Sequence, residues 1–464
     1  MTRLTPNQLL AATSGRWHNS APPAADEPLS GGFVIDSREA GRGDVFWTLG
    51  GHRTHGVQFV AEAFARGAAG VVTDQLPADA SVETPDGKFA IIVRDAVEAL
   101  GHAAAWRREH FAGRVVAVTG SVGKTTTRQL IDQVLARSYK GTASRRNHNN
   151  HLGVPLSMLA WSAEQDYAVL ELAASAVGEV RALSELAAPH IGVITRIGEA
   201  HLAGFGSREA ILSAKAELLG SLPMSGLAVL NGDDPQLRRL AVRPGVRTVW
   251  VGRGLDNDIT ATRIRSANGQ LDLFVGKQPL RVPIWGRHHV VSVLAAVAVG
   301  REFGLSDAEI AAALAEFHCP PMRCEVSGVR GASLINDAYN SNPTAMRAAL
   351  ELLRDFDSPG RRIVVCGDMR ELGRESIKLH RTLGDEVVTL CGADVLVACG
   401  EFADEVAAGA QAAGMSPART IICHEPDDAA RHVNRLLAPG DVVLVKGSRA
   451  TEMDRCVEFL AKAA

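Results

Sequence analysis

The stretch "GSVGKTTT" at residues 120–127 carries the residue types that bind phosphate. It follows the β-branched run "VVAVT" and opens a helix-like run, so backbone amides and the positive end of a helix would point at one anion. Lys124 would reach the outer phosphates and the Thr125 hydroxyl would coordinate Mg²⁺. Val118 stands where the longer phosphate-loop pattern has its first glycine, so the stretch fits the shorter GxxGKT form. The predicted phosphate-binding residues are Gly120, Ser121, Val122, Gly123, Lys124, Thr125 and Thr126.

The alternative for this stretch is a tight strand-to-helix turn with an exposed lysine. Two further polar features could serve a phosphate site. Glu171 ends the strand candidate "YAVLE", and carboxylates meet ligands at the mouth of a parallel sheet. Asn147, Asn149 and Asn150 share one loop and could offer amide donors to phosphate oxygens without adding charge. The alternatives are a solvated strand-end residue and an ordinary asparagine-rich turn.

The elements that must position these residues alternate between strand and helix. At ~150 residues per domain, 464 residues predict about three domains. A break near "HFAGR" and the two prolines of "HCPPM" divide the chain into 1–110, 111–319 and 320–464. The expected fold class is α/β: a small N-terminal α/β domain, a central domain on a mainly parallel sheet, and a doubly wound, Rossmann-like C-terminal domain. Alternating strands around Asn268-Gly269 predict an antiparallel excursion, and Ser306 with Glu309 predicts a capping box.

Composition narrows the class of protein. A net charge of −3 gives no reason to expect a nucleic-acid or anionic-membrane partner. No apolar run approaches the ~20 residues that span a bilayer, and the start lacks the apolar segment of a secretory signal. Seven cysteines without a CxxC pair are typical of reduced thiols in a cytoplasmic protein.

Several motifs in order resemble those of the Mur ligases, over essentially the whole chain. They are "GSVGKTTT", "NHNNHLGVPL", "ELAAS", "IGEAHLAGFGSREAILSAKAELL", "LNGDD", "PPMRCE", "NDAYNSNPTAM", "GDMRELG" and "LVKGSRATEM". The resemblance implies an ATP-dependent ligase of bacterial cell-wall synthesis, which phosphorylates a carboxylate and lets an amine attack the acyl phosphate. "YNSNP", "GDMRELG" and "LVKGSR" resemble the branch that adds D-alanyl-D-alanine to UDP-N-acetylmuramoyl-tripeptide, and the DNPR motif of the diaminopimelate-adding branch is absent. A bacterial cytoplasmic monomer is expected.

The same resemblance implies roles for residues of the central domain. Lys124 would be the fixed cation on the ATP phosphates, and Thr125 and Glu171 would hold Mg²⁺. His201 and Lys215 are similar to the family's second metal site, where a carbamate formed from carbon dioxide would turn the lysine into an anion. Read from the residues alone, "ILSAKAELL" is an amphipathic helix with a solvated lysine. Asn150 and His289 would contact ATP.

Residues of the two other domains receive roles in the same way. Arg323 would reach the transferring phosphate or the ribose, since guanidinium geometry suits oxygen-rich targets. Asp337 would accept from ribose hydroxyls, and the N-terminal domain would bind UDP. The predicted substrate contacts are Ser37 and Arg38 at the uridine diphosphate end, and Tyr339, Asn340, Asn342, Lys446 and Arg449 at the dipeptide end. Closure of the domains would exclude water from the acyl phosphate.

Some positions depart from the family pattern. Arg196 follows Thr195 where asparagine is usual, and Ala173 replaces a glycine. His289 and Ser292 replace two asparagines near the adenine, and His55 and Val57 stand in the segment that usually reads DGH. Two alternatives therefore stay open: a folylpolyglutamate synthetase-like ligase, and a regulatory protein that binds nucleotide but no longer ligates. The sequence does not decide whether the tripeptide ends in diaminopimelate or lysine.

Overall fold

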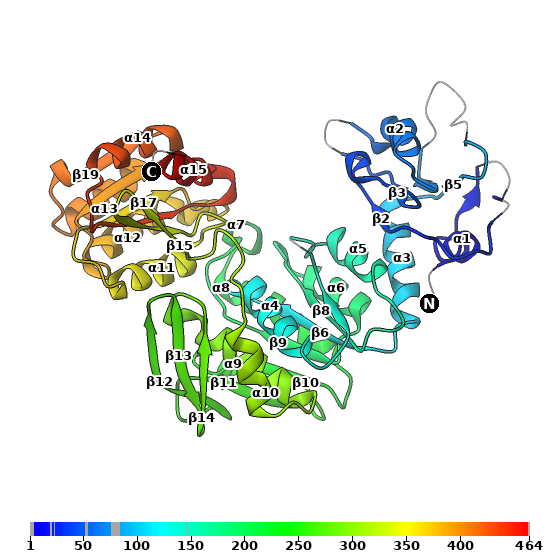
Figure 1. The fold of residues 1–464 in the computed structure, drawn as a ribbon, viewed down its shortest axis with the longest axis horizontal. Helices are drawn as coiled ribbons and strands as arrows, with labels where there is room; N and C mark the ends of the chain where they lie inside the picture. Colours follow the sequence, from blue (N-terminus) through cyan, green and yellow to red (C-terminus); the bar gives the residue numbers. More distant parts are fainter. Residues whose placement is uncertain are drawn as a thin grey trace.

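The computed structural model describes residues 4–18, 21–22, 24–51, 54–75, 84–145 and 147–462. The strands of this part of the chain form three separate sheets of five, nine and six strands. We call the parts built on them the N-terminal, central and C-terminal units. Figure 1 shows the N-terminal and C-terminal units at opposite ends of the central unit.

The N-terminal unit is built on a five-stranded sheet of order β1-β5-β4-β3-β2. Only the β1–β5 pair is antiparallel. Its core is formed in part by β3, whose residues are all buried, and by the buried face of helix α3. Asp95 caps the N-terminus of α3. Its elements are α1 Pro6–Ala12, β1 Arg16–Trp17, β2 Phe33–Val34, η1 Ser37–Glu39, β3 Val45–Trp47, η2 Gly56–Phe59, α2 Val60–Ala65, β4 Gly70–Thr73, β5 Phe89–Ile92 and α3 Ala96–Glu109.

The central unit holds the phosphate-loop stretch. Its sheet has the order β14-β13-β12-β11-β10-β9-β6-β8-β7, in which β6 lies between β9 and β8 and all pairs from β7 to β12 are parallel. Fully buried β-branched strands of this kind need helices on both faces. Its elements up to β11 are β6 Arg114–Thr119, α4 Lys124–Leu135, β7 Gly141–Ala143, α5 Gly153–Leu159, β8 Tyr167–Glu171, α6 Glu179–Ala187, β9 Ile191–Ile194, α7 Leu202–Phe205, α8 Arg208–Gly220, β10 Leu227–Asn231, η3 Leu237–Arg239 and β11 Arg247–Gly252.

The predicted antiparallel excursion is confirmed. Strands β12 and β13 pair antiparallel up to Ala267 and Gln270, and Asn268 and Gly269 both adopt positive φ (52° and 78°), as a two-residue hairpin turn requires. The capping box of Ser306 and Glu309 is also present. The remaining elements of this unit are β12 Ile259–Ala267, β13 Gln270–Val275, β14 Gln278–Val282, η4 Arg287–His289, α9 Val290–Glu302 and α10 Asp307–Ala315.

The C-terminal unit is a six-stranded sheet of order β15-β16-β20-β17-β18-β19, antiparallel only at β15–β16. Apolar clusters cover both faces of it, as in a doubly wound sheet. Its elements are β15 Glu325–Val329, β16 Ala332–Asn336, α11 Pro343–Asp355, β17 Arg362–Gly367, η5 Gly373–Glu375, α12 Ser376–Thr389, β18 Val395–Cys399, α13 Ala403–Ala412, η6 Pro417–Arg419, β19 Thr420–Cys423, α14 Pro426–Leu436, β20 Val442–Lys446, η7 Arg449–Thr451 and α15 Asp454–Lys462.

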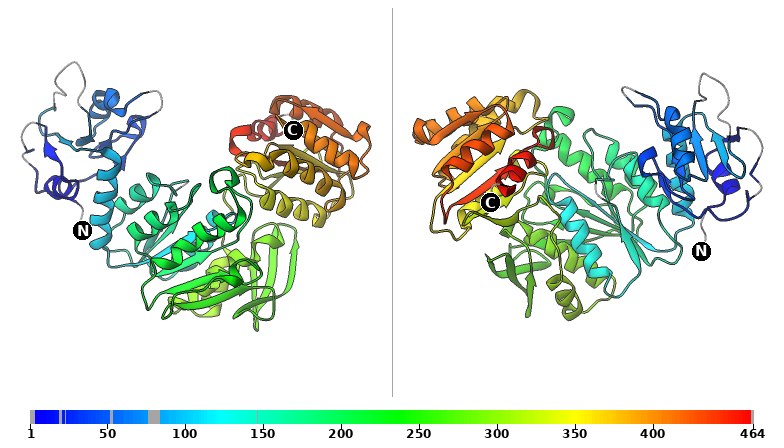
Figure 2. Two further views of the ribbon diagram at one scale, coloured as in Figure 1. Left: turned by 180° about the vertical axis from the view of Figure 1, so that it is seen from behind. Right: turned by 45° about the horizontal axis from the view of Figure 1, so that its top comes forward.

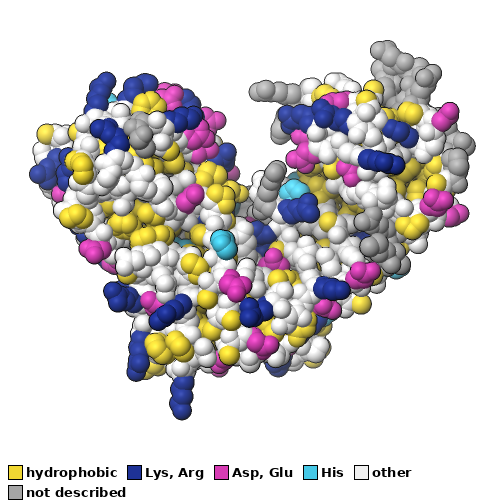
Figure 3. Space-filling view, viewed as in Figure 1, with side chains coloured by type: hydrophobic (Ala, Val, Ile, Leu, Met, Phe, Trp, Pro, Cys, Tyr) yellow, Lys and Arg dark blue, Asp and Glu magenta, His cyan; other side chains and the backbone are white. Residues whose placement is uncertain are grey.

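The three units are arranged as an arch. The two further views in Figure 2 agree that the C-terminal unit meets the central unit near α7 and the β12–β13 hairpin, while α3 leads to the N-terminal unit at the other end. The space-filling view is deeply notched between the two outer units (Figure 3). The predicted α/β class with a mainly parallel central sheet and a Rossmann-like last unit is confirmed. Among the described residues, no helix has the length and apolarity to cross a membrane.

Candidate active site

The phosphate-loop stretch forms a tight turn between β6 and α4. Gly120 and Gly123 have φ values of 142° and 83°, which side chains other than glycine rarely adopt. A Cβ on Gly120 would collide with the Thr195 hydroxyl, so this glycine is required for close packing as well. The loop carbonyls are held from the neighbouring strand: Thr195 Oγ1 donates to the Val122 carbonyl at 2.6 Å. The result is a fixed loop ahead of the positive end of α4.

Lys124 stands at the first position of α4 and folds back over the loop. Its Nζ donates to the Gly120 carbonyl at 2.7 Å. Burial lowers the pKa of Lys124, while the nearby Glu171 carboxylate acts in the opposite direction. A phosphate oxygen bound in the loop would replace the Gly120 carbonyl as the acceptor for the Lys124 ammonium. Ser121 and Thr126 are buried, and the Ser121 hydroxyl donates to the Gly198 carbonyl at 2.9 Å, so the serine supports the loop from beneath.

Glu171 lies beside the loop because β8 pairs with β6 in register. Val118 is paired with Glu171, which places the carboxylate at the strand end next to the turn. Glu171 is only 3% exposed, and its two oxygens accept from Thr125 Oγ1 at 2.8 Å and from Asn149 Nδ2 at 2.9 Å. The Arg128 Nε lies 3.7 Å from the same carboxylate.

This donor set fits Mg²⁺. A hydroxyl and a carboxylate are hard oxygen ligands, which Mg²⁺ prefers together with phosphate oxygens and water. Thr125 and Glu171 are already adjacent, so the two residues need no large movement to bind one ion between them and a nucleotide.

The C-terminal unit adds cations to the loop from across the cleft. Arg323 Nη2 donates to Thr125 Oγ1 at 3.1 Å, and its guanidinium stacks on the Tyr339 ring at 4.1 Å. Lys446 is 2% exposed and its Nζ lies 2.6 Å from Asp337 Oδ2. Lys446 also donates to the Asn340 carbonyl at 2.9 Å. The Asp337 carboxylate is therefore neutralised within its own unit, while Arg323 faces the phosphate loop.

His201 and Lys215 have different partners in this structure. His201, with a positive φ of 56°, contacts the Glu371 carboxylate of the C-terminal unit. Lys215 Nζ donates to the Ala174 carbonyl at 3.1 Å and lies 5.2 Å from the centre of the Phe205 ring. Burial lowers the pKa of Lys215 to about 7. The lysine is 2% exposed, so it is buried rather than solvated as the helix pattern alone suggested.

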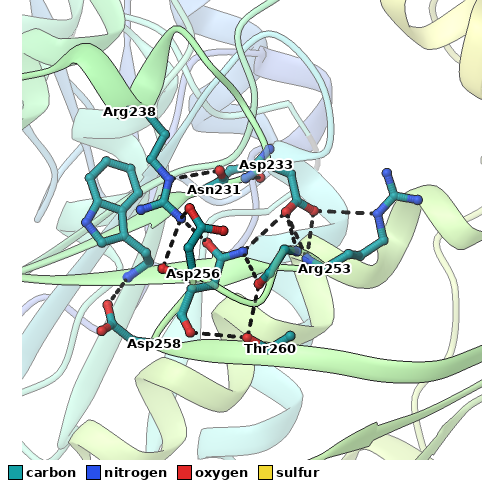
Figure 4. A network of polar contacts seen from close by, with 11 residues as sticks. Asn231, Asp233, Arg238, Arg253, Asp256, Asp258 and Thr260 are labelled. Carbon is teal, nitrogen blue, oxygen red and sulfur yellow. Dashed lines mark hydrogen bonds and ion pairs between the residues drawn. The ribbon is translucent and has the colours of Figure 1, made fainter.

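One cleft of ≈ 1190 Å³ between the central and C-terminal units is lined by the phosphate loop together with Glu171, His201, Arg323 and Lys446, while Lys215 is not part of its lining. One rim comes from the ends of β10 and β11, where the "LNGDD" turn is held by a polar network (Figure 4). Asp233 accepts from the backbone amides of Arg253 and Gly254 at 2.8 and 3.0 Å, and Arg238 Nη2 donates to Asn257 Oδ1 at 2.8 Å. Asn231, Asp233 and Arg253 line the cleft as part of this rim.

Most predicted site residues lie in the cleft. The lining includes the loop from Ser121 to Thr126, Glu171, His201, His289, Arg323, Asp337, Tyr339, Asn340, Asn342 and Lys446. Asn342 also caps α11, since its Oδ1 accepts from Ala345 N.

Six predicted residues are outside this lining: Gly120 and Lys215, whose contacts are given above, and the four that follow. Asn150 accepts from the amides of Leu152 and Gly153 and supports its own turn, so the structure puts Asn149, not Asn150, in the cleft. Arg449 pairs with Asp454 at 2.7 Å. Ser37 and Arg38 belong to the N-terminal unit, where Ser37 Oγ donates to Glu62 at 2.8 Å and Arg38 pairs with Asp36 at 2.6 Å.

Two of the residues that depart from the family pattern, Ser292 and His55, have side-chain partners in this structure. Ser292 accepts from Thr127 Oγ1 at 2.8 Å, and His55 Nε2 lies 3.0 Å from Asp74 while its Nδ1 accepts from the Val57 amide. Arg196 lines the cleft. Asn149 is one of three candidate amides in its loop, from which the sequence favours Asn150. The site residues that sequence reasoning missed are Thr195, Arg128 and the side chains of the "LNGDD" rim, because no local pattern shows which side chains meet.

Comparisons with known proteins agree with this geometry. Two family descriptions match: the Mur ligase middle domain over residues 118–300, and the Mur ligase, glutamate ligase domain over residues 322–449. The fold and the cleft thus define a ligase of the Mur class, with the phosphate loop in its middle part.

Full-length relatives identify the branch. UDP-N-acetylmuramoyl-tripeptide--D-alanyl-D-alanine ligase of Bacillus subtilis (strain 168) is 34% identical over 95% of both chains, and that of Escherichia coli (strain K12) is 33% identical over 92% of this chain and 93% of its own. A crystal structure of MurF from Acinetobacter baumannii has a TM-score of 0.85 at 31% identity, covering 99% of this chain and 98% of that one. The chain belongs to the UDP-N-acetylmuramoyl-tripeptide--D-alanyl-D-alanine ligase family.

Two further structures bear on the nucleotide and on the alternative. MurF ligase from Thermotoga maritima in complex with ADP has a TM-score of 0.80 at 28% identity, over 94% of this chain and 98% of that one. Folylpolyglutamate synthase from Mycobacterium tuberculosis has a TM-score of 0.62 at 16% identity, over 78% of this chain and 94% of its own. The latter likeness shows a shared fold alone.

Proposed function

We propose that this chain joins D-alanyl-D-alanine to UDP-N-acetylmuramoyl-tripeptide. ATP phosphorylates the terminal carboxylate of the tripeptide, and the amine of the dipeptide attacks the acyl phosphate, giving the pentapeptide precursor, ADP and phosphate. The observation that carries the proposal is the contact between Arg323 and Thr125, because it brings a cation of the C-terminal unit to the threonine of the phosphate loop in the central unit. Similarity over 95% of the chain to a relative with this activity supports the substrates.

Charge is the main obstacle to the first step. A carboxylate and a phosphate with unit charges ~4 Å apart repel by about 4 kcal/mol at an effective dielectric of 20. Lys124 and Arg323 approach the phosphate loop from two sides and would offset that repulsion where charge is transferred. The attacking amine must lose a proton on forming the amide, and the loop and cleft walls would hold water away from the acyl phosphate meanwhile.

Mg²⁺ would be held by Thr125 and Glu171, and it supplies charge neutralisation on the phosphates when it is bound. His201 and Lys215 are proposed for a second ion, with Lys215 as a carbamate. A buried amine with a pKa of about 7 is about half neutral at pH 7 and mostly neutral above it, and only the neutral amine has the lone pair that adds to carbon dioxide. For this role the Lys215 side chain must leave the Ala174 carbonyl, and His201 must exchange its Glu371 contact for the ion.

The substrates would occupy separate parts of the molecule. Ser37 and Arg38 are proposed for the uridine diphosphate end, and Tyr339, Asn340, Asn342, Lys446 and Arg449 for the dipeptide. We assign residues 1–110 to the UDP-precursor domain, 111–319 to the ATP domain and 320–464 to the dipeptide domain. The enzyme would act in the bacterial cytoplasm and would be a monomer.

The test is dipeptide-dependent phosphate release. Purified chain receives ATP, Mg²⁺ and UDP-N-acetylmuramoyl-tripeptide, with and without D-alanyl-D-alanine, and both phosphate and pentapeptide product are measured. Lys124→Ala should lower the rate by about 10²–10³-fold, as expected on removing one preorganised donor to a developing charge. Lys277→Ala, an exposed lysine in the β13–β14 turn, is the matched control and should change nothing.

Two results would contradict the proposal. Phosphate release that does not depend on the dipeptide would favour the regulatory alternative, in which nucleotide binds without ligation. Ligation by Lys124→Ala at undiminished speed would refute the role of the loop lysine.

A further inference from the structure

Two adjacent histidines and a cysteine meet where the central and C-terminal units join. His288 and His289 belong to η4, just ahead of α9, and Cys324 directly precedes β15. One potential ligand atom from each of the three residues lies within 4.8 Å of those of the other two. His288 Nε2 and Cys324 Sγ are 3.9 Å apart. All three residues belong to the lining of the cleft.

The cluster contains a polar atom that no other contact explains. His289 is 6% exposed, and its Nε2 is buried without a hydrogen-bond partner in the described part of the chain. Leaving such an atom unpaired is costly, so an unpaired buried ring nitrogen points to a ligand that is bound in use.

The cluster is not suited to nucleophilic catalysis by cysteine. Burial raises the pKa of the Cys324 thiol well above its usual range, and burial lowers the pKa of His288 to about 4. The pair therefore consists of a thiol and a neutral imidazole, whereas a reactive cysteine is a thiolate beside an imidazolium. Neutral imidazole is also the form that binds metals.

Sulfur and two imidazole nitrogens select a borderline or soft cation. Zn²⁺ binds cysteine and histidine tetrahedrally at ~2.3 and ~2.0–2.1 Å, which places neighbouring ligand atoms about 3.4–3.6 Å apart. The observed spacings, 3.9 Å for His288 and Cys324 and up to 4.8 Å in the cluster, are about 0.3–1.4 Å longer, so side-chain rotations would close the site. Mg²⁺ would not compete, because it prefers oxygen ligands.

We propose that His288, His289 and Cys324 form a site for Zn²⁺ or a similar thiophilic divalent cation, with one position left to water. The bound ion would join η4 of the central unit to the start of the C-terminal unit. It would thereby restrict the movement of these units and occupy the cleft wall beside Arg323. Zinc would accordingly inhibit the nucleotide-dependent reaction without touching Thr125 or Glu171.

The surrounding charges are compatible with a cation once the thiol has lost its proton. Asp337 is the acidic group near His288, while Lys446 and Arg196 oppose a cation there and Arg323 opposes one near His289. Binding replaces the thiol proton by the metal, so the S–H bond breaks, a sulfur–metal bond forms and the proton passes to solvent. The thiolate then supplies one negative charge inside the site.

Cobalt spectroscopy on the full chain tests the site without depending on ligase activity. Co²⁺ is added to protein free of nucleotide and Mg²⁺, and thiolate-to-cobalt charge transfer is recorded in the near ultraviolet. We expect a saturable band at one equivalent per chain that Zn²⁺ bleaches. No band, or a band that Zn²⁺ does not displace, would overturn the proposal even if every variant failed to fold.

Matched variants identify the ligands. Equilibrium dialysis with Zn²⁺ alone should show affinity reduced by more than about 10-fold in Cys324→Ser, since losing even an outer-shell partner costs 10–100-fold. Cys319→Ser and His318→Asn, close along the chain but outside the cluster, should bind as the wild type does. Equal loss in Cys319→Ser would overturn the ligand assignment, and so would full binding by Cys324→Ser.

Inhibition connects the site to the cleft, and this last step rests on the proposed function. Micromolar Zn²⁺ should slow dipeptide-dependent phosphate release by the wild type and leave Cys324→Ser much less affected. If Zn²⁺ binds but the reaction is equally fast, the metal site stands and its inhibitory role is refuted. If no ligation occurs at all while the cobalt band is present, the proposed function fails and the metal site does not.

Discussion

At the scale of single residues, Glu171 joins groups that come from separate parts of the chain. Thr125 and Asn149 donate to its two oxygens, and Arg128 lies 3.7 Å away. A buried carboxylate held in this way keeps its orientation, because rotation would break a bond on either side. Such preorganisation is what a metal ligand needs to position phosphates.

Glu171→Gln should therefore weaken Mg²⁺ binding with little change of shape. We expect phosphate release to fall by about 10²–10³-fold at low Mg²⁺, and the loss to become smaller as Mg²⁺ is raised. The measurement is a Mg²⁺ titration of the reaction rate. Glu185→Gln, an exposed glutamate of α6, is the control. An unchanged Mg²⁺ dependence would show that Glu171 does not bind the ion.

Lys215 gives a second prediction at this scale. With ¹³C-labelled carbon dioxide, the wild type should show a carbamate carbon signal that Lys215→Arg lacks and Lys277→Arg retains. Because the reacting form is the neutral amine, the signal should be retained above pH 7 and decline as pH falls below the lysine pKa of about 7. A signal of equal strength in Lys215→Arg would assign the carbamate to another amine.

At the scale of elements, the β6–α4 turn depends on one glycine. Gly120→Ala would bring a methyl group against Thr195 Oγ1 at a positive φ, so the loop must shift and nucleotide binding should be lost. We expect destabilisation by about 1–3 kcal/mol. Gly101→Ala is the control, because Gly101 lies in α3 with open space around it and should gain about 0.5–1 kcal/mol. Thermal unfolding and calorimetry of ADP binding measure both, and normal ADP affinity in Gly120→Ala would contradict the expectation.

The edge where β17 meets β20 gives a pH-dependent prediction. Asp441 is buried and accepts from the amides of Arg361 and Ala438 and from the Arg361 guanidinium. Burial alone would raise the pKa of Asp441, but these bonds outweigh it and the pKa is lowered. The stabilisation from Asp441 is therefore fully present above pH ~4, the pKa of an aspartate in the unfolded chain. It is lost as the pH falls through the lower pKa that Asp441 has in the folded protein.

Asp441→Asn should accordingly lower the free energy of unfolding by about 2 kcal/mol near pH 7. This value already includes a reduction for solvent screening, because the Arg361 side chain is 39% exposed. Denaturant unfolding of the wild type and variant at pH 7 and pH 3 should show the difference shrinking at the lower pH. Asp86→Asn, an exposed turn residue, should show little difference at either pH. An equal difference at both values would exclude ionisation of Asp441 as its origin.

At the scale of the whole molecule, hydrogen bonds connect the central and C-terminal units around the cleft. Thr344 Oγ1 donates to Glu199 at 2.9 Å, and the Ala203 amide donates to the Glu371 carbonyl at 2.8 Å. The N-terminal unit lies at the far end of the arch (Figure 1). A substrate that extends from a UDP site in that unit to the phosphate loop would have to draw the units together.

Small-angle scattering tests this closure. The radius of gyration should fall when UDP-N-acetylmuramoyl-tripeptide, a non-hydrolysable ATP analogue and Mg²⁺ are all present, and each ligand alone should give a smaller change. The reason is that binding energy from both ends of a long substrate offsets the cost of ordering the units. No compaction with all ligands bound would count against closure.

The sequence by itself determined the features that depend on neighbours along the chain. Positive φ at Gly120, Gly123 and Gly269, the capping box of Ser306 and the alternation of buried strands with helices are local consequences of sterics and hydrogen bonding. For this reason the phosphate loop and the α/β class were predictable, and the ordered motifs indicated the family.

Only the tertiary structure decided which side chains meet. The pairing of β6 with β8 places Glu171 beside Thr125. Tertiary packing also directs Asn149 rather than Asn150 to the cleft and buries Lys215 against Phe205. It also brings Cys324 to His288, 36 residues away. Such contacts depend on the packing of strands and units that are distant in sequence, so residue spacing along the chain does not predict them.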